Sequence, residues 1–196
     1  MYVYKFFEGL TTKKLGFISI IPNFCIKIYQ MTEANNISII AYSKMYKKDL
    51  LRLLTELHSI HFHSSAPAQS IELLEEKNIE HTYENYIKEI QDDDKWKILL
   101  AINEQNDVIG FIIGSLKMDE DLVKSRIGIL EDWLVLTEKR RMGTGMKLYA
   151  ALEKWFTEKG CEHLMSATWQ GNECSINAHL KLGFYVSEVS FGKKLK

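Results

Sequence analysis

The sequence predicts an α/β domain, in which strands and helices alternate along most of the 196 residues. Apolar runs of strand length recur, and leucines at helical spacing fill the segment from Lys47 to Ile60. A long amphipathic segment also follows a glycine-containing turn at Gly143 and Gly145. The composition is 46% hydrophobic, which is sufficient for one well-packed core.

The first predicted element is a short strand at Ile37 to Ala41, where apolar residues run together. The leucines of Lys47 to Ile60 recur every three or four residues and predict a helix. Ser64 to Ala68 contains a proline and small residues, which break that helix. Two helical pieces are expected next, at Ser70 to Lys77 and at Thr82 to Ile90.

The middle of the chain predicts an antiparallel hairpin. Trp96 to Asn103 and Val108 to Lys117 are apolar or alternating segments, and the polar segment Glu104 to Asp107 joins them. A third apolar segment, Ile127 to Val135, predicts another strand, which leads into a basic turn.

A helix is predicted from about Gly143 to Lys159, because its apolar residues form one stripe and Gly160 is placed to end it. Cys161 to Trp169 predicts a strand, and a short helix is expected after Asn172. The tail from Phe184 to Leu195 has apolar residues without a helical stripe, so we expect a closing strand there.

The turn from Arg140 to Met146 has the composition of a phosphate-binding site. A helix start exposes unpaired N–H groups at the positive end of the helix dipole, and glycine lets an anion approach the main chain. A dinucleotide fingerprint would need a further glycine where Leu148 stands, and the Gly-Lys-Ser/Thr of a Walker loop never occurs. We therefore expect an anionic ligand other than those two nucleotide classes.

The pattern from Arg140 to Gly145, after a strand ending in Val135, resembles the acetyl-CoA signature of the GNAT superfamily of N-acetyltransferases. Asn172, followed by a short helix and Gly183-Phe184, resembles the second signature of the same family. The resemblance covers about residues 127–185. It implies a GNAT-like α/β (α+β) fold, with a mixed, mostly antiparallel central sheet flanked by helices, and acetyl-CoA as the acetyl donor.

The resemblance also implies which residues bind the coenzyme. A bulge in the strand would free backbone groups of Trp133, Leu134 and Val135 for the pantetheine and the thioester oxygen. Asn172 would bond the pantetheine amide, and a loop or helix-cap role is the alternative for this residue. The diphosphate would be held by the N–H groups of Arg141, Met142, Gly143, Thr144, Gly145 and Met146. By the same resemblance, Arg140 occupies the Gln/Arg position of the family, and Arg141 stands where many relatives have glycine.

Glu131 and Asp132 interrupt an otherwise apolar strand, and without a bulge only one of them can point at the site. The surrounding phrase resembles that of aminoglycoside and polyamine N-acetyltransferases, in which acidic groups meet cationic acceptors. We expect Glu131 to anchor the acceptor or to act as its base, and Asp132 is the second candidate. A structural salt bridge is the alternative for both residues.

His179 falls where many relatives carry a tyrosine thought to protonate the leaving thiolate. Histidine can replace that tyrosine, because an imidazolium is a stronger acid than a thiol. Tyr185 and Tyr149 are alternative donors, and a packed, hydrogen-bonded histidine without a chemical role is the other interpretation of His179.

The composition of the chain narrows the classes of partner that it is expected to bind. The net charge of −1 supplies no basic field for nucleic acid and no polybasic membrane patch. The three cysteines are far apart and match neither a disulfide framework nor a metal site, which is typical of a reducing cytoplasm. His58, His61 and His63 cluster without a carboxylate or thiol to complete a ligand set, so no metal is expected.

The expected organisation is an N-terminal extension of open role at residues 1–31 and a GNAT-like acetyltransferase domain at residues 32–196. The expected activity is direct transfer of an acetyl group from acetyl-CoA to a primary amine, in the first place a small cationic amine. A protein N-terminal or lysine acetyltransferase and a non-catalytic acyl-CoA-binding sensor are the alternatives. The sequence leaves open whether the chain acts as a monomer or as a homodimer.

Overall fold

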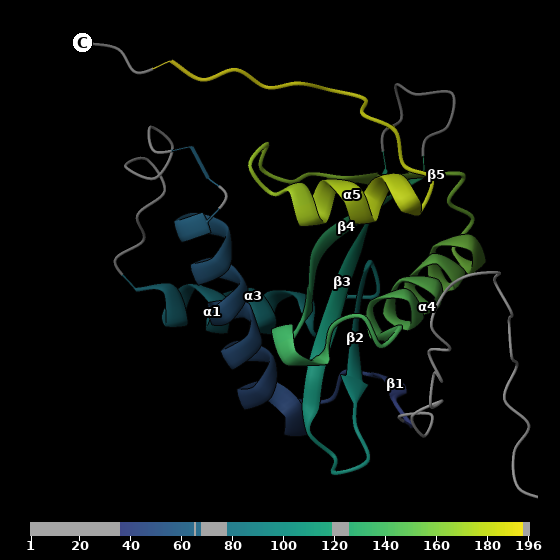
Figure 1. Ribbon diagram of the computed structural model, residues 1–196. Coiled ribbons are helices and arrows are strands. Elements are labelled where there is room, and N and C mark those ends of the chain that lie inside the picture. The colour runs from purple at the N-terminus through teal and green to yellow at the C-terminus, as the bar shows by residue number, and fades with distance from the viewer. Residues whose placement is uncertain (1–35, 65, 68–77, 119–125, 194–196) are drawn as a thin grey trace, which may run out of the picture. The chain divides into compact units, whose positions relative to one another are not determined.

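The computed structural model describes residues 36–64, 66–67, 78–118 and 126–193 (Figure 1). The extension expected at residues 1–31 and the helical piece expected at Ser70 to Lys77 lie outside these described residues.

The described residues form a five-stranded sheet with the order β1-β2-β3-β4-β5. Neighbouring strands from β1 to β4 pair antiparallel, whereas β5 pairs parallel to β4. The sheet is therefore mixed and mostly antiparallel, as expected. Its strands are β1 (Ser38–Ala41), β2 (Trp96–Ile102), β3 (Val108–Met118), β4 (Arg126–Val135) and β5 (His163–Ser166).

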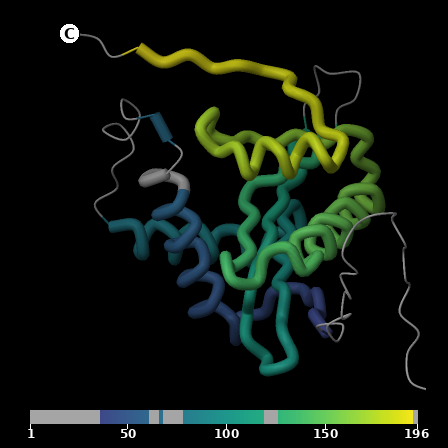
Figure 2. Tube along the Cα trace, in the orientation of Figure 1, coloured from purple at the N-terminus to yellow at the C-terminus, as the bar shows by residue number. Residues whose placement is uncertain are grey.

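Helices cover both faces of this sheet (Figures 1 and 2). α1 (Lys47–Ser64) and α3 (Ile79–Ile90) pack on one face, and α4 (Thr144–Glu158) packs on the other. α5 (Glu173–Lys181) follows β5. Two short 3-10 turns, η1 (Lys44–Tyr46) and η2 (Thr137–Lys139), precede α1 and the α4 turn.

The core is split by the sheet into two apolar clusters. Successive residues of β3 enter opposite clusters, as the period of a strand requires: Phe111 and Ile113 join the α1/α3 side, and Ile112 joins the α4 side. The first cluster is filled mainly by leucines and isoleucines of the two helices, and the second by Leu148, Leu152 and Phe156 of α4. We refer to these two sides as the α1/α3 face and the α4 face.

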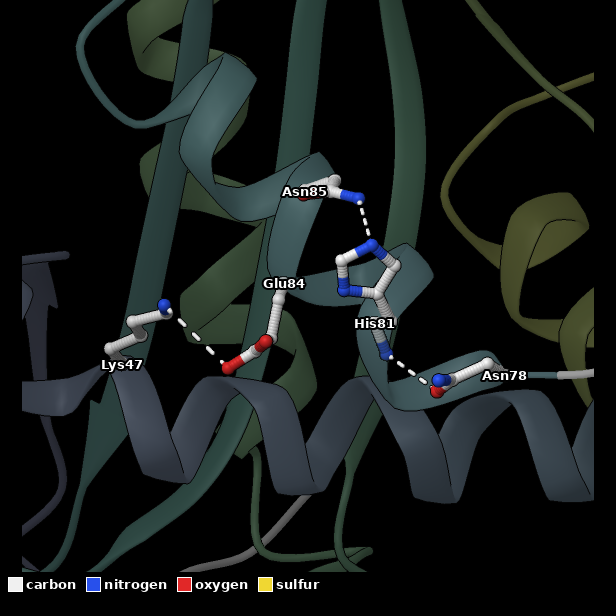
Figure 3. A network of polar contacts seen from close by, with 5 residues as sticks. All are labelled: Lys47, Asn78, His81, Glu84 and Asn85. Carbon is white, nitrogen blue, oxygen red and sulfur yellow. Dashed lines mark hydrogen bonds and ion pairs between the residues drawn. The ribbon is translucent and has the colours of Figure 1, made fainter.

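Polar contacts fix the start of α3 against α1 (Figure 3). The side chain of Asn78 caps α3 by accepting a hydrogen bond from the backbone N–H of His81 at 3.1 Å. Asn85 bonds the ring of His81 one turn later, at 3.1 Å. Glu84 lies 3.8 Å from the ammonium of Lys47 on α1, so the two helices are joined by a half-exposed ion pair.

The C-terminal segment differs from the expectation. The structure has no strand in residues 184–193, so the closing strand predicted at Phe184 to Leu195 is wrong for the described part of that segment. Its apolar side chains are largely exposed, with Phe191 94% and Tyr185 78% accessible. An alternating pattern forms a strand only where a sheet edge receives it, and within the described chain this tail pairs with none. β5 is also shorter than the predicted Cys161 to Trp169.

The described helices include none with the length and apolar character that crossing a membrane requires.

Gly114 tests how closely β3 and α4 pack. A Cβ at Gly114 would lie 2.6 Å from Cζ of Phe156 and 2.9 Å from Cδ1 of Leu152, and both side chains are buried. We expect Gly114→Ala to lower the free energy of unfolding by about 1–3 kcal/mol in urea titrations, because the core is overpacked. Gly192→Ala is the control, since a Cβ there would meet nothing within 4 Å. Equal stability of both variants would show that α4 can move away without loss.

Candidate functional site

The turn between β4 and α4 leaves the start of the helix uncovered. Gly143 is the N-cap of α4, and as a glycine it has no side chain to cap the N–H groups of the first turn. Its φ of 80° lies in the left-handed region, which glycine tolerates. A Cβ at Gly143 would meet nothing within 4 Å, so open space adjoins these N–H groups. This geometry suits an anion.

The two arginines of the turn have different structural roles. Arg140 donates a hydrogen bond from Nε to the carbonyl oxygen of Val135 at 2.9 Å, which ties the turn to the end of β4. Arg141 is exposed and has a φ of 61°, again in the left-handed region. Glycine adopts this backbone conformation without strain, which is a physical reason for the glycine that the family resemblance implies at this position.

Two buried polar groups near the turn lack protein partners among the described residues. Thr144 is 1% exposed, and its hydroxyl makes no hydrogen bond there; the same holds for the indole Nε1 of Trp133. The indole packs against the first turn of α4, where a Cβ at Gly145 would come within 3.0 Å of it. Buried donors are almost always paired in folded proteins, so these two indicate a ligand or a water at this place.

β4 and β5 part halfway along β4. β5 pairs only with Ile127 to Leu130, whereas β4 continues to Val135. From Glu131 onward, the edge of β4 toward β5 therefore carries backbone groups that β5 does not pair. Trp133, Leu134 and Val135 lie along this unpaired edge, and their roles toward the coenzyme stay a prediction.

His179 lies at the point where the strands part. Its Nε2 is 3.0 Å from the hydroxyl of Ser166 on β5, and that hydroxyl donates to the carbonyl of Leu130 on β4 at 3.1 Å. Its Nδ1 lies 2.7 Å from the carbonyl of Ser175. A carbonyl only accepts, so Nδ1 is the donor in the contact with Ser175, and the hydroxyl of Ser166 links Nε2 to Leu130 of β4.

Aromatic rings hold His179 in this orientation. The imidazole meets Trp133 edge-on at 6.3 Å between ring centroids and Phe184 at 5.1 Å. The structure thus brings together Trp133 and His179, which the sequence predicted separately. Asn172 caps α5 by accepting from the N–H of Ser175 at 3.1 Å, so its oxygen has the helix-cap role that the sequence left open.

A bulge in β4 decides where the two carboxylates point. Ile113 of β3 is opposite Asp132, but the next residue, Gly114, is opposite Leu130, so Glu131 is an extra residue in the ladder. The bulge that the family resemblance implied is therefore at Glu131, and it cancels the alternation between Glu131 and Asp132.

Both acidic side chains lie on the α1/α3 face. The hydroxyl of Ser115 donates to Glu131 at 2.5 Å, and the hydroxyl of Tyr86 on α3 donates to Asp132 at 3.2 Å. Ser115 is directly opposite Trp96 in the β2–β3 ladder, and Trp96 packs edge-on against Tyr86 at 5.9 Å. Two negative charges therefore converge next to an aromatic wall, which is an arrangement suited to a cation.

The two carboxylates differ in environment. Burial raises the pKa of Asp132 to about 6; the hydrogen bond from Tyr86 opposes this rise, and the charge of Glu131 adds to it. Glu131 is exposed. Burial, together with both carboxylates, raises the pKa of Tyr86, which keeps its hydroxyl a neutral donor.

The tyrosines considered as alternative donors lie in contrasting places. Tyr185 is 78% exposed on the C-terminal tail. Tyr149 is buried in α4, and its hydroxyl donates to Glu153 at 2.9 Å. Burial raises the pKa of Tyr149, which makes its phenol a weaker acid.

Sequence reasoning missed three residues of the site: Tyr86, Ser115 and Ser166. The only available signal was the presence of serines in otherwise apolar strands, which does not reveal a partner. Of the histidine cluster, His58 is in ring contact with Tyr83 at 6.0 Å, and the side chains of His61 and His63 lie outside the described residues. A search of the described residues finds no group of metal-binding side chains.

Curated relatives match a part of the chain. The aminoglycoside N(6')-acetyltransferase type 1 of Klebsiella aerogenes is 33% identical over 88 residues, which are 44% of this chain and 58% of the relative. The enzyme of the same name from Salmonella typhimurium is 36% identical over 89 residues, which are 44% of this chain and 61% of the relative. The chain thus spans about three fifths of the length of these relatives.

Solved structures and a family model match a larger part of the chain. The aminoglycoside N-acetyltransferase AAC(6')-Iy in complex with CoA is 26% identical, with a TM-score of 0.65 over 82% of this chain and 95% of that chain. The apo enzyme AAC(6')-IG from Acinetobacter haemolyticus shares the fold, with a TM-score of 0.63 at 23% identity over 81% of this chain and 99% of that one. The predicted GNAT-like fold is thereby confirmed. The model of the acetyltransferase (GNAT) family matches residues 54–184, and the chain belongs to this family.

Proposed function

We propose that the protein transfers the acetyl group of acetyl-CoA directly to a primary amine of a small cationic acceptor. The observation that carries this proposal is the bulge in β4, which turns Glu131 and Asp132 to one face of the strand that leads into the anion-binding turn. A cation-binding side and an anion-binding end therefore belong to the same strand. Direct transfer needs both reactants aligned in this way.

The donor site is proposed along β4 and the α4 turn. The N–H groups from Arg141 to Met146 would hold the diphosphate, and the unpaired edge at Trp133 to Val135 would pair with the pantetheine, next to Asn172. The open space at Gly143 and the unpartnered polar groups of Thr144 and Trp133 support this assignment. Acetyl-CoA, when bound there, supplies an acyl group activated as a thioester.

The acceptor site is proposed on the α1/α3 face. Glu131 is exposed and held by Ser115, so its charge is placed to anchor an ammonium group. Aminoglycosides carry several ammonium groups, and the similarity to aminoglycoside N(6')-acetyltransferases supports an acceptor of this kind. A protein N-terminus or lysine and a sensor without turnover are the alternatives.

The transfer itself needs three proton movements. The acceptor ammonium loses one proton to a carboxylate, and its nitrogen forms the C–N bond as the C–S bond of the thioester breaks. The nitrogen then loses its second proton to water, and the departing thiolate takes a proton. We assign this proton to His179, with Tyr185 as the alternative donor, because Ser166 and Ser175 hold the ring at the place where β4 and β5 part.

Acceptor-dependent release of free thiol from acetyl-CoA tests the proposed activity. We expect turnover with polyamine and aminoglycoside acceptors, and at least tenfold lower kcat/KM with a neutral peptide that carries one free N-terminus. Tight CoA binding without turnover on any amine would instead identify a sensor, and preference for the peptide would identify a protein acetyltransferase.

Gly143→Asp tests the donor site. The new carboxylate would enter the open space at the start of α4 and repel a diphosphate, so we expect at least tenfold weaker CoA binding by calorimetry. Gly160→Asp is the matched control, because Gly160 has a φ of 77° and lies just beyond the other end of the same helix. Equal weakening in both variants would mean that backbone strain, and not the lost anion site, is responsible.

His179→Gln tests the proton donor. We expect kcat to fall about tenfold or more, equivalent to roughly 1.4 kcal/mol of barrier, while CoA binding changes less than twofold. His163→Gln, at an exposed position on β5 three residues before Ser166, is the control and should keep the wild-type rate. A wild-type kcat in His179→Gln would exclude this histidine as the donor.

A further inference from the structure

We propose that Asp132, and not Glu131, is the base that takes the proton of the acceptor amine, and that Tyr86 is the residue that positions it. The proposal rests on the proposed transferase function and assigns one step within it. It departs from the sequence-based expectation, which favours Glu131 as anchor or base.

The two carboxylates are equally oriented but unequally surrounded. Glu131 is exposed, and a serine hydroxyl binds its Oε1, so this carboxylate is placed to hold a cationic group at the solvent side. Asp132 is half-buried, and the Tyr86 hydroxyl binds its Oδ2. Within the described residues Oδ1 receives no hydrogen bond, which leaves this oxygen for an amine. Paired carboxylates in different environments commonly divide the roles of electrostatic anchor and proton carrier.

The position of Asp132 along β4 fits a group that acts beside the thioester. It immediately precedes Trp133, where the edge of β4 has already parted from β5. Glu131 is the extra residue of the bulge, one position nearer the paired half of the strand. A nitrogen that bonds Oδ1 of Asp132 would therefore stand next to the unpaired edge on which the pantetheine is proposed to lie.

Tyr86 is itself fixed by aromatic packing. Its ring meets Tyr83 edge-on at 6.4 Å and Trp96 at 5.9 Å, so the hydroxyl is directed at Asp132 by a rigid wall. The groups around Asp132 come from five elements. Tyr86 belongs to α3, with Tyr83 of the same helix and His58 of α1 behind it, and Glu131 belongs to β4. The uncharged Trp96 comes from β2, and Ile113 and Ser115 come from β3. Among them, Tyr86 and Glu131 act on Asp132 directly.

The proton balance is simple. One ammonium proton moves to Oδ1 of Asp132, the freed nitrogen lone pair forms the C–N bond, and the thiolate leaves with the C–S electron pair and takes a proton from His179. The acylated nitrogen loses its second proton to water, and Asp132 returns its own proton to solvent before the next turnover. Because burial raises the pKa of this carboxyl to about 6, it is ionised at neutral pH and yet is a stronger base than an ordinary carboxylate.

The pH profile of kcat/KM gives a signed test. In the wild type, kcat/KM should rise with pH through about 6, because the base of the free enzyme must be ionised, and a fall at higher pH would belong to the proton donor. Tyr86→Phe removes a hydrogen bond that favours the charged form and should move this limb to higher pH. Glu131→Gln removes a neighbouring negative charge and should move it to lower pH. Asp132→Asn should abolish the limb and lower kcat at least tenfold.

A matched control separates positioning from general damage. Tyr83→Phe removes a hydroxyl one turn earlier on the same helix and should leave the limb in place. CoA binding should stay within twofold of the wild type in all four variants. The assignment would be overturned if the limb of the pH profile moved in the same direction in Tyr86→Phe and Glu131→Gln. It would also be overturned if Asp132→Asn kept the wild-type rate and the wild-type limb.

Stability provides a readout that needs no turnover. A carboxyl with a raised pKa binds its proton more tightly when folded, so its contribution to stability is present below the unfolded pKa of about 4 and is lost as pH rises through about 6. Relative to the wild type, Asp132→Asn should therefore raise Tm more at pH 7.5 than at pH 4.5. Asp94→Asn, at an exposed position, should show the same difference at both values.

The two proposals fail differently. Absence of wild-type turnover on every amine would overturn the transferase function, and the base with it. The assignment of Asp132 alone would be overturned if the wild type turns over but Asp132→Asn changes Tm equally at the two pH values. It would also be overturned if the wild type turns over but the pH limb of Tyr86→Phe is not shifted.

Discussion

The candidate site depends on one irregularity, the extra residue at Glu131 in β4. In a regular ladder, Glu131 and Asp132 would face opposite sides of the sheet, and one carboxylate would enter the apolar cluster beneath α4. The bulge instead turns both toward α1 and α3, where Ser115 and Tyr86 supply hydroxyl donors. A single inserted residue thereby places two negative charges side by side where hydroxyl groups solvate them.

The same strand separates the charges of the proposed reactants. Its middle presents carboxylates to the α1/α3 face, and its end leads to the basic turn and the uncapped start of α4. A cationic acceptor and an anionic donor would thus be drawn to different parts of β4 and would meet at the edge where β5 departs. His179 is located at this departure point, because Ser166 and Leu130 bridge the imidazole to both strands. Electrostatics and strand geometry therefore favour the same meeting place.

Local patterns predicted the elements, and long-range pairing decided the site. Apolar periodicity predicted the hairpin, α1, α3, α4 and the turn at Gly143, because each signal lies within about twenty residues. The sequence could not predict that Glu131 and Asp132 point to the same face, because the bulge follows from the register between β3 and β4. Tyr86 meets a carboxylate 46 positions away and Ser166 a carbonyl 36 positions away, and neither pairing leaves a local signal. The strand predicted in the C-terminal tail is wrong for a related reason, because a strand requires a partner edge.

Arg141 shows how stability and function oppose each other in the turn. A residue with a side chain in the left-handed region costs on the order of 1 kcal/mol, which a glycine would avoid. A hydrogen bond from a charged group contributes about 1.5–3 kcal/mol, so a guanidinium bonded to a phosphate would more than offset that strain. The balance holds only while an anion is bound; without one, the strain is uncompensated. An exposed arginine at a glycine-favouring position thus has a physical reason to be there only if the turn binds the anionic donor proposed for it.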